Sequence, residues 1–211
     1  MHLEILIEEP SAEAALQILI PKIAGPHLSF RMITFQGKHD LLARLPQRMR
    51  GYARWLPPDY RIVVVVDEDR QDCRQLKQQL ETAALMAGLT TKTSTTPDGL
   101  FQVLNRIAVE ELEAWFWGDF EALRQAYPRL PATLPSRRAY RNSDAIAGGT
   151  AEALERELQR AGYYSSGLAK MQAARDIAPY MQPDRNRSQS FQVFCDGIKA
   201  LLTRGLRSDI S

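Results

Sequence analysis

The stretch that most constrains the fold is "RIVVVVDEDRQDC", residues 61–73. Residues 62–66 are five consecutive β-branched apolar residues, and Asp67, Glu68 and Asp69 follow them directly. A strand that is apolar on both faces is typical of the interior of a parallel sheet, where helices cover both sides. The stretch therefore predicts an α/β fold with acidic side chains at the end of a central strand.

The first half of the chain alternates between strand and helix patterns. We expect strands at residues 3–7, 28–35, 62–66, 89–95 and 101–108, and helices at 11–20, 39–56 and 72–87. Ser11 is expected to cap the first helix, Pro46 to interrupt the second and Gly88 to end the third. This alternation predicts a mostly parallel sheet flanked by helices.

The strand pattern stops after residue 108. Residues 109–127 predict a helix that breaks near Gly118, where Asp119 is a candidate cap, and three prolines make 128–138 a connector. Further helices are expected near 151–161, 168–178 and 190–203. The C-terminal part is therefore predicted to be helical.

The bulk composition, with 45% of the 211 residues hydrophobic and 25% charged, suits one sizeable soluble domain, or a domain with a small appendage. We expect an α/β core at residues 1–125 and a helical C-terminal extension, 126–211, packed on that core. The acidic start "MHLEILIEEP" is unlike a signal peptide, and no apolar run has the roughly 18 residues of a membrane span. Cys73 and Cys195 are far apart and are expected to be reduced, which favours a cytoplasmic location without a membrane partner.

A second acidic strand end lies at Glu8 and Glu9, after residues 3–7. Because side chains of a strand alternate, Asp67 and Asp69 are expected to share one face. If the two strands are parallel neighbours, Glu8 approaches both aspartates at the carboxyl edge of the sheet, where such folds bind ligands. Clustered carboxylates repel one another unless a cation compensates them. Mg²⁺ prefers oxygen ligands and leaves room for a phosphate, so a magnesium site is one interpretation.

The simpler interpretation of the D-x-D is a turn or a helix cap, in which Asp69 or Asp72 caps the next helix. The second acidic strand end favours the metal site, because capping one helix does not require both. Glu110 and Glu113 are three residues apart, hence on one face of the expected helix, and could support a second metal. Acids also favour the first turn of any helix, so both interpretations remain open here.

A glutamate at the end of the first strand and a D-x-D at the end of a later buried strand resemble the TOPRIM domain. More closely, the chain resembles a TOPRIM-like bacterial family of formerly unknown function, related to OLD-type nucleases and often encoded beside an ATPase in phage-defence loci. The resembling stretches span most of the chain: "LIEEPSAEAAL", "FQGKHDLLARLPQRMRGYA", "VVVVDEDRQDC", "NRIAVEELEAWFWGD" and "NRSQSFQVF". The sequence departs from the TOPRIM pattern at Glu9 and Pro10, where a glycine usually follows the first glutamate.

The resemblance implies a TOPRIM-like sheet that binds Mg²⁺, or Mn²⁺ as a substitute, through Asp67 and Asp69. Glu8 would be a ligand or the general acid/base for phosphodiester cleavage. Glu113 completes the expected catalytic set, and Glu110 joins these four in the expected metal site. The resemblance also implies an ATPase as a partner.

Basic residues gather in strips that suit a polyanion. Residues 38–54 carry five basic residues against one acid, and residues 129–141 carry four with no acid. The candidate nucleic-acid-binding residues are Lys38, Arg48, Arg137, Arg138, Arg141, Lys170 and Arg187. Exposed helices normally carry arginines, so the simpler interpretation of any single one of these residues is an ordinary surface position. For Trp115 and Trp117, core packing is favoured over base stacking.

The sequence therefore favours an Mg²⁺-dependent nuclease, and the resemblance adds the role of effector in an ATPase-controlled defence system. One alternative is a non-catalytic regulatory subunit that binds nucleic acid or the ATPase. Another is an enzyme that acts on small phosphoesters. The sequence contains no G-x-x-x-x-G-K-[ST], G-x-G-x-x-G or H-E-x-x-H motif, and its three histidines lie in the first fifth of the chain. A histidine-centred triad or a zinc site is therefore not expected.

Overall fold

The centre of the protein is a four-stranded, all-parallel sheet in the order β2-β1-β3-β4. The structure is a computed structural model that describes residues 1–69 and 71–205. The strands are β1 (His2–Ile7), β2 (Ser29–Thr34), β3 (Tyr60–Asp67) and β4 (Val103–Ala108). The predicted α/β fold with a parallel sheet is confirmed, and β1 and β3 are neighbours, as the acidic-edge interpretation required.

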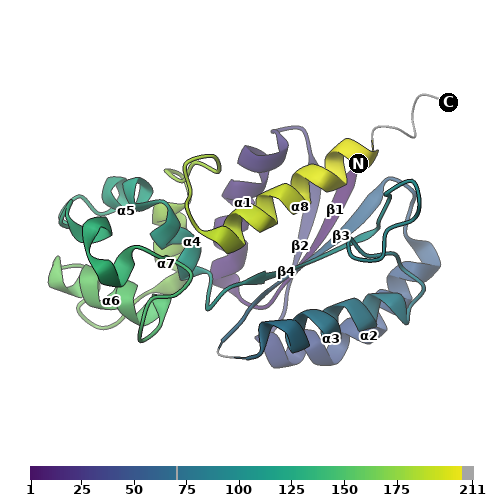
Figure 1. Cartoon of the computed structure of the whole chain (residues 1–211), viewed down its shortest axis with the longest axis horizontal. Helices are drawn as coiled ribbons and strands as arrows, with labels where there is room; N and C mark the ends of the chain where they lie inside the picture. Colours follow the sequence, from purple (N-terminus) through teal and green to yellow (C-terminus); the bar gives the residue numbers. More distant parts are fainter. Residues whose placement is uncertain (70, 206–211) are drawn as a thin grey trace.

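Helices cover both faces of the sheet. Helices α1 (Pro10–Ala24) and α8 (Gln189–Gly205) lie on one face, and α2 (Lys38–Trp55) and α3 (Cys73–Leu85) lie on the other (Figure 1). Val63 and Val65 of β3 pack into the cluster that contains α1 and α8, whereas Val64 and Val66 pack with α2 and α3. This arrangement explains why β3 is apolar on both faces.

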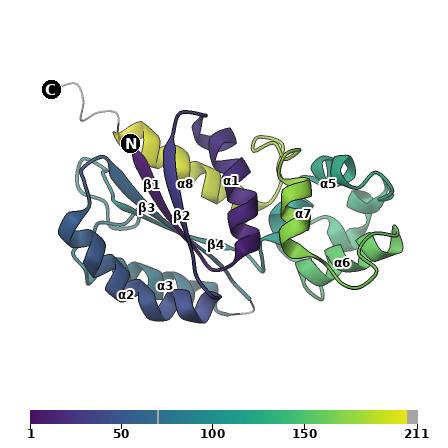
Figure 2. The ribbon, with the colours of Figure 1, turned by 180° about the vertical axis from the view of Figure 1, so that it is seen from behind.

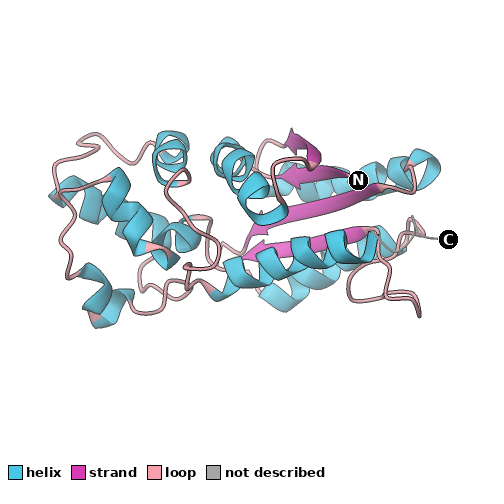
Figure 3. Cartoon of the chain, turned by 90° about the horizontal axis from the view of Figure 1, so that it is seen from above, coloured by secondary structure: helices cyan, strands magenta, loops and turns pink. Residues whose placement is uncertain are grey.

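A helical lobe stands beyond the carboxyl ends of the strands (Figures 1 and 3). It consists of α4 (Glu113–Gly118), α5 (Phe120–Ala126), α6 (Thr150–Arg160), α7 (Lys170–Ile177) and short 3-10 turns at Leu134–Ser136 and Arg138–Tyr140. The view from behind shows α7 alongside α1, in agreement with the contacts between them (Figure 2). The C-terminal part is helical as predicted, but it divides: α6 and α7 belong to the lobe, while α8 returns to the sheet beside β4.

Three local predictions are wrong. Residues 89–95 form no strand: Thr91 makes only an isolated bridge to Val103, because hydroxyl groups of Thr91 and Ser94 bond the local backbone and bend the chain. Helix α2 continues through Pro46. Helix α1 begins at Pro10, so Ser11 lies inside it and donates to the side chain of Glu9 instead of capping the helix.

None of the helices in the described residues is long and apolar enough to cross a membrane.

Candidate acidic site at the carboxyl edge of the sheet

The acidic strand ends meet at the point where the chain topology reverses. The connection from β1 leads to β2 on one side, and the connection from β3 leads to β4 on the other, so the topological switch point of the sheet lies between β1 and β3. Glu8 follows β1 and Asp67 ends β3, and the backbone N–H of Asp67 donates to Glu8 Oε1 at 3.0 Å. Gly37 N–H also donates to the carbonyl of Glu8, at 2.8 Å, which fixes Glu8 against the loop after β2.

Three carboxyl groups from separate elements are buried at this edge. The exposed fractions of Glu8, Asp67 and Glu113 are 6%, 7% and 1%. Burial raises the pKa of Glu8 to about 7 and that of Glu113 to about 7. Burial, followed by the charges of Glu8 and Glu113, raises the pKa of Asp67 well above its ordinary value. Within the described chain, Glu8 Oε2 and Glu113 Oε2 are buried without a hydrogen-bond partner. The site therefore holds acceptor oxygens of Glu8 and Glu113 without hydrogen-bond partners, on carboxyl groups whose ionised forms burial disfavours.

The helix cap after β3 is Asp72. Its Oδ1 accepts from Arg74 N–H at 2.8 Å and from Gln75 N–H at 3.0 Å, as a capping side chain does. Asp67 and Asp69 are consequently not needed as caps of α3. Helix capping therefore explains Asp72 but does not explain Asp67 or Asp69.

Asp69 lies outside the strand and has a lysine partner. Strand β3 ends at Asp67, and Asp69 has a left-handed φ of +47°, so strand alternation does not align the two side chains. Lys38 Nζ lies 2.9 Å from Asp69 Oδ2 and donates to the carbonyl of Glu68 at 3.0 Å. Lys38, expected in an exposed basic strip, is in fact 10% exposed and belongs to the acidic edge.

Glu110 and Glu113 do not share a helix face, so this prediction is wrong. Helix α4 begins at Glu113, and Glu110 precedes it with a left-handed φ of +59°. The Glu110 N–H donates to Glu68 Oε2 at 3.0 Å, and the Asp69 N–H donates to the Glu110 carbonyl at 2.9 Å. These bonds join the loops after β3 and β4, which holds both left-handed residues in place.

Lys170 brings a positive charge from α7 to the buried carboxylates. Its Nζ lies 3.5 Å from Glu113 Oε1 and 3.5 Å from Glu111 Oε1. Burial opposes the lysine charge, but Glu113, Glu9 and Glu111 together raise the pKa of Lys170. Glu111 also accepts from Ala151 N–H at 3.0 Å, at the start of α6. Glu9 and Glu111 were not predicted as site residues; the acidic pairs at 8–9 and 110–111 were the signal for them.

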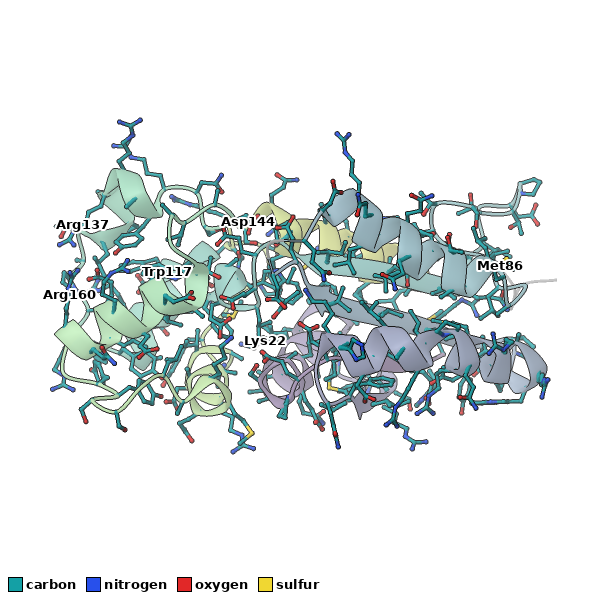
Figure 4. The ribbon with its side chains drawn as sticks, turned by 90° about the horizontal axis from the view of Figure 1, so that it is seen from below. Lys22, Met86, Trp117, Arg137, Asp144 and Arg160 are labelled. Carbon is teal, nitrogen blue, oxygen red and sulfur yellow. The ribbon has the colours of Figure 1, made fainter. Side chains whose placement is uncertain are left out.

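The other basic candidates lie at separate places. Arg141 and Arg187 line a pocket of about 240 Å³ in the lobe, together with Arg185, whose guanidinium binds Asp119 through contacts of 2.8 and 3.0 Å. Arg137 and Arg138 are exposed on the lobe surface, where Figure 4 shows Arg137 at its outer side. Arg48 lies on α2. The structure therefore does not gather these residues into one strip.

The stretch "NRSQSFQVF" has a structural role. Ser188 Oγ accepts from Phe191 N–H at 3.2 Å at the start of α8 and donates to Asp144 at 2.6 Å. Asp144 lies at the junction of the lobe and the sheet (Figure 4). Asn186 donates to the Trp115 carbonyl at 2.7 Å, and Trp115 packs on Phe191 and Phe194 in the core, as predicted for this tryptophan.

An acidic cleft of about 760 Å³ opens beside the buried carboxylates. Its lining includes Glu68, Asp69, Glu110, Glu111 and Glu152, together with the backbone around Gly148 and Gly149, and none of the described lining residues is a lysine or an arginine. A polyanion would be repelled from this cleft unless a cation neutralised part of the lining. The electrostatics of the cleft therefore favour a cation as the first ligand.

The donor set at the acidic edge fits Mg²⁺ only in part. Carboxylate oxygens with unpaired acceptors suit a hard divalent cation, and Mg²⁺ commonly takes only one or two carboxylates and keeps its waters. Glu8, whose Oε2 is unpaired, and Asp67, whose N–H donates to the other oxygen of Glu8, would supply these carboxylates. Among residues 1–69 and 71–205, however, no group of three or more His, Cys, Asp or Glu side chains is arranged to hold a metal ion. The fit is thus to a hydrated ion with few protein ligands.

Comparison with known proteins gives a family and no relative of known activity. Neither the curated proteins nor the solved structures gave a match to this chain. A family model described as "Domain of unknown function (DUF4276)" matches residues 7–199, which is most of the chain. The protein therefore belongs to the DUF4276 family.

Proposed function

We propose that this protein is a nuclease that uses Mg²⁺, or Mn²⁺ in its place, to cleave nucleic-acid phosphodiesters at the acidic edge. The observation that carries the proposal is the burial of Glu8, Asp67 and Glu113 at the carboxyl edge of the sheet, with acceptor oxygens of Glu8 and Glu113 left unpaired. Burial of like charges costs stability, and such groups are concentrated at functional sites. The TOPRIM-like relationship is part of this proposal, supported by an acidic residue at the ends of the neighbouring strands β1 and β3.

Each residue has a distinct role in the proposed reaction. Glu8 and Asp67 would hold the cation, and a bound Mg²⁺ would polarise the phosphoryl group and activate a water. Glu113, on α4, is part of the same charge cluster and would accept a proton from the attacking water. Lys170, next to Glu113, would stabilise negative charge that develops on the phosphate. Asp69 is held by Lys38, so it would add a ligand only when that lysine moves to a phosphate.

The test combines metal binding with cleavage. Calorimetric titration with Mn²⁺ should show a saturable site in the parent and none in Glu8→Gln or Asp67→Asn. Cleavage of single- and double-stranded DNA and RNA should require the metal and be lost in both variants. Arg50→Ala, an exposed change on α2, is the control that should keep both properties. Absence of metal binding at millimolar concentration in the parent would contradict the proposal.

A second candidate function is a non-catalytic regulatory subunit. The favouring observation is that the protein neutralises part of the cluster itself, through Lys170 on Glu111 and Glu113 and through Lys38 on Asp69. Binding of nucleic acid or of the partner ATPase without metal-dependent cleavage would support this candidate. The ATPase partner and a cytoplasmic location belong to the proposal alone; the resemblance supports the first and the reduced cysteines support the second.

A further inference from the structure

A second pocket, of about 390 Å³, lies between β2 and α2 at the edge of the sheet. Its lining includes Glu4 of β1 and the carboxyl-terminal half of α2, which ends at Trp55. Glu4 precedes Glu8 by four residues, so the pocket begins about 13 Å along the strand from the acidic site. It is therefore a separate place on the molecule.

The rim of this pocket is positively charged. Arg31 projects from β2, and Arg44 and Arg48 project from successive turns of α2. Arg44 pairs with Asp40 at 2.6 Å, whereas Arg31 and Arg48 are exposed and form no ion pair in the described part of the chain. Two unpaired guanidinium groups on one rim are suited to a phosphate.

The base of the pocket contains a buried acceptor. Glu4 is 4% exposed, and its Oε2 accepts from the Tyr52 hydroxyl at 2.8 Å. Its Oε1 lies 3.2 Å from His2 Nε2. A carboxylate fixed by two side chains retains lone pairs for a hydroxyl or amino group of a ligand, but it repels an anion. The pocket thus separates an anion-binding rim from an acceptor at its base.

An exposed aromatic ring completes the pocket. Trp55 is 55% exposed, whereas the other two tryptophans, Trp115 and Trp117, are 0% and 5% exposed. The ring of Trp55 is held by Tyr52 and Tyr60, at centroid distances of 5.5 and 6.1 Å. A fixed, exposed indole beside arginines is the arrangement on which a nucleic-acid base stacks while its phosphate is held.

We infer that this pocket binds a nucleotide, either free or as one unit of a nucleic-acid strand. The base stacks on Trp55, the phosphate binds Arg31 and Arg48, and a hydroxyl or amino group donates to Glu4. The assignment does not require the proposed cleavage, because every group it uses lies away from the acidic edge. If the nucleotide belongs to a strand, the pocket anchors that strand beside the sheet.

Tryptophan fluorescence provides a direct test, because Trp55 is the exposed tryptophan. The full chain, in chelator, is titrated with nucleoside monophosphates, the matching nucleosides, inorganic phosphate and a short single-stranded oligonucleotide. We expect a saturable change with nucleotide-containing probes, and binding about tenfold or more weaker for nucleosides and for phosphate. Preference for the oligonucleotide identifies a strand as the source, and preference for the monophosphate identifies a free nucleotide. Because the chelator removes metal, failure of the proposed cleavage does not affect this result.

Gly51 offers a variant that blocks the pocket without endangering the fold. Gly51 is a residue of α2 that lines the pocket, and a Cβ at this position would meet nothing within 4 Å. Gly51→Met should therefore fill the pocket, strengthen the helix and abolish nucleotide binding while the melting temperature stays equal or rises. Arg31→Ala and Arg48→Ala should each weaken binding about tenfold, whereas Arg50→Ala, outside the pocket on the same helix, should not.

Three results would overturn the inference. The first is the absence of a saturable change with any nucleotide-containing probe. The second is unchanged affinity in Gly51→Met. The third is binding of an acidic peptide or of inorganic phosphate as tight as that of the nucleotide, because the site would then recognise charge without a base.

Discussion

At the scale of the residue, the buried acids are expected to affect how the stability of this protein depends on pH and, in the proposed function, on metal. Asp67 has its pKa raised by burial and by the charges of Glu8 and Glu113, so the folded protein disfavours its ionised form. Replacement by an uncharged side chain of similar shape removes that unfavourable term. The same replacement removes a ligand from the proposed cation. The effect on stability should therefore reverse between metal-free and metal-loaded protein.

Thermal melts of Asp67→Asn should show this reversal. In chelator at pH 8, the variant should melt at the same temperature as the parent or higher. In millimolar Mg²⁺ or Mn²⁺, the parent should become the more stable protein, because an ion that binds only the folded state stabilises it by mass action. A variant that melts markedly lower in chelator, with no metal effect in either protein, would make Asp67 a structural residue.

Glu113 should make the free energy of unfolding depend on pH, and the sign of this dependence is definite. Burial raises the pKa of Glu113 from 4.5 to about 7, so between these pH values the folded state binds more protons than the unfolded state. The free energy of unfolding should consequently decrease as pH rises through this window. In chelator, Glu113→Gln should lessen that decrease, by up to about 3 kcal/mol between pH 4.5 and pH 8. Urea unfolding at several pH values measures the effect; parallel curves for parent and variant would contradict it.

At the scale of the element, a lysine of helix α1, which covers the sheet, attaches the lobe to the core. Lys22, near the end of α1, donates to the carbonyls of Ala178, Pro179 and Met181 at 3.1, 2.5 and 2.9 Å (its place is labelled in Figure 4). These carbonyls follow α7, whose first residue is Lys170. Helix α7 thus presents Lys170 at one end to the acids and is held at the other end by Lys22.

Loss of this attachment should affect both stability and the site. Lys22→Met should lower the free energy of unfolding by on the order of 1 kcal/mol, because the carbonyls lose a charged donor in a partly exposed position. Metal affinity measured by calorimetry should change as well, since α7 positions Lys170. Lys22→Arg, which keeps the donors, is the matched control. If the Lys22→Met variant is destabilised but its metal affinity is unchanged, the contacts of Lys22 do not influence the acidic site.

Periodicity predicted the elements well because long-range packing and local pattern agree. The five β-branched residues of β3 have helices on both faces, which is the environment their composition requires. The strand expected at 89–95 failed because short-range hydroxyl bonds of Thr91 and Ser94 are not visible as a hydrophobic period. The site was predictable at Glu8 and Asp67, whose places follow from strand pairing. The acidic pairs at 8–9 and 110–111 indicated Glu9 and Glu111, but the contacts of Lys38 and Lys170 with the acids depend on how loops and the lobe pack, which no local pattern specifies.

At the scale of the whole molecule, the acidic cleft and the exposed arginines of the lobe are on different parts of the surface. The acidic edge lies between the sheet and the lobe, while Arg137, Arg138 and Arg141 are exposed residues of the lobe that do not line the acidic cleft. In the proposed function, these arginines would contact a nucleic acid at a different part of the surface from the acidic edge. The affinity for the nucleic acid should then depend on counterion release from the phosphates that they contact.

The last prediction concerns that salt dependence. For a DNA duplex in chelator, the logarithm of the association constant should fall linearly with the logarithm of salt concentration. Replacing Arg137, Arg138 and Arg141 together by Ala should reduce the slope by roughly 1 to 3, because each lost phosphate contact contributes about 0.9. Replacing three exposed cations elsewhere, Arg74, Arg175 and Lys199, removes the same charge and should change the slope less. Equal slopes for the parent and the lobe variant would exclude these arginines from phosphate contact, and an equal reduction in both variants would show that only net charge matters.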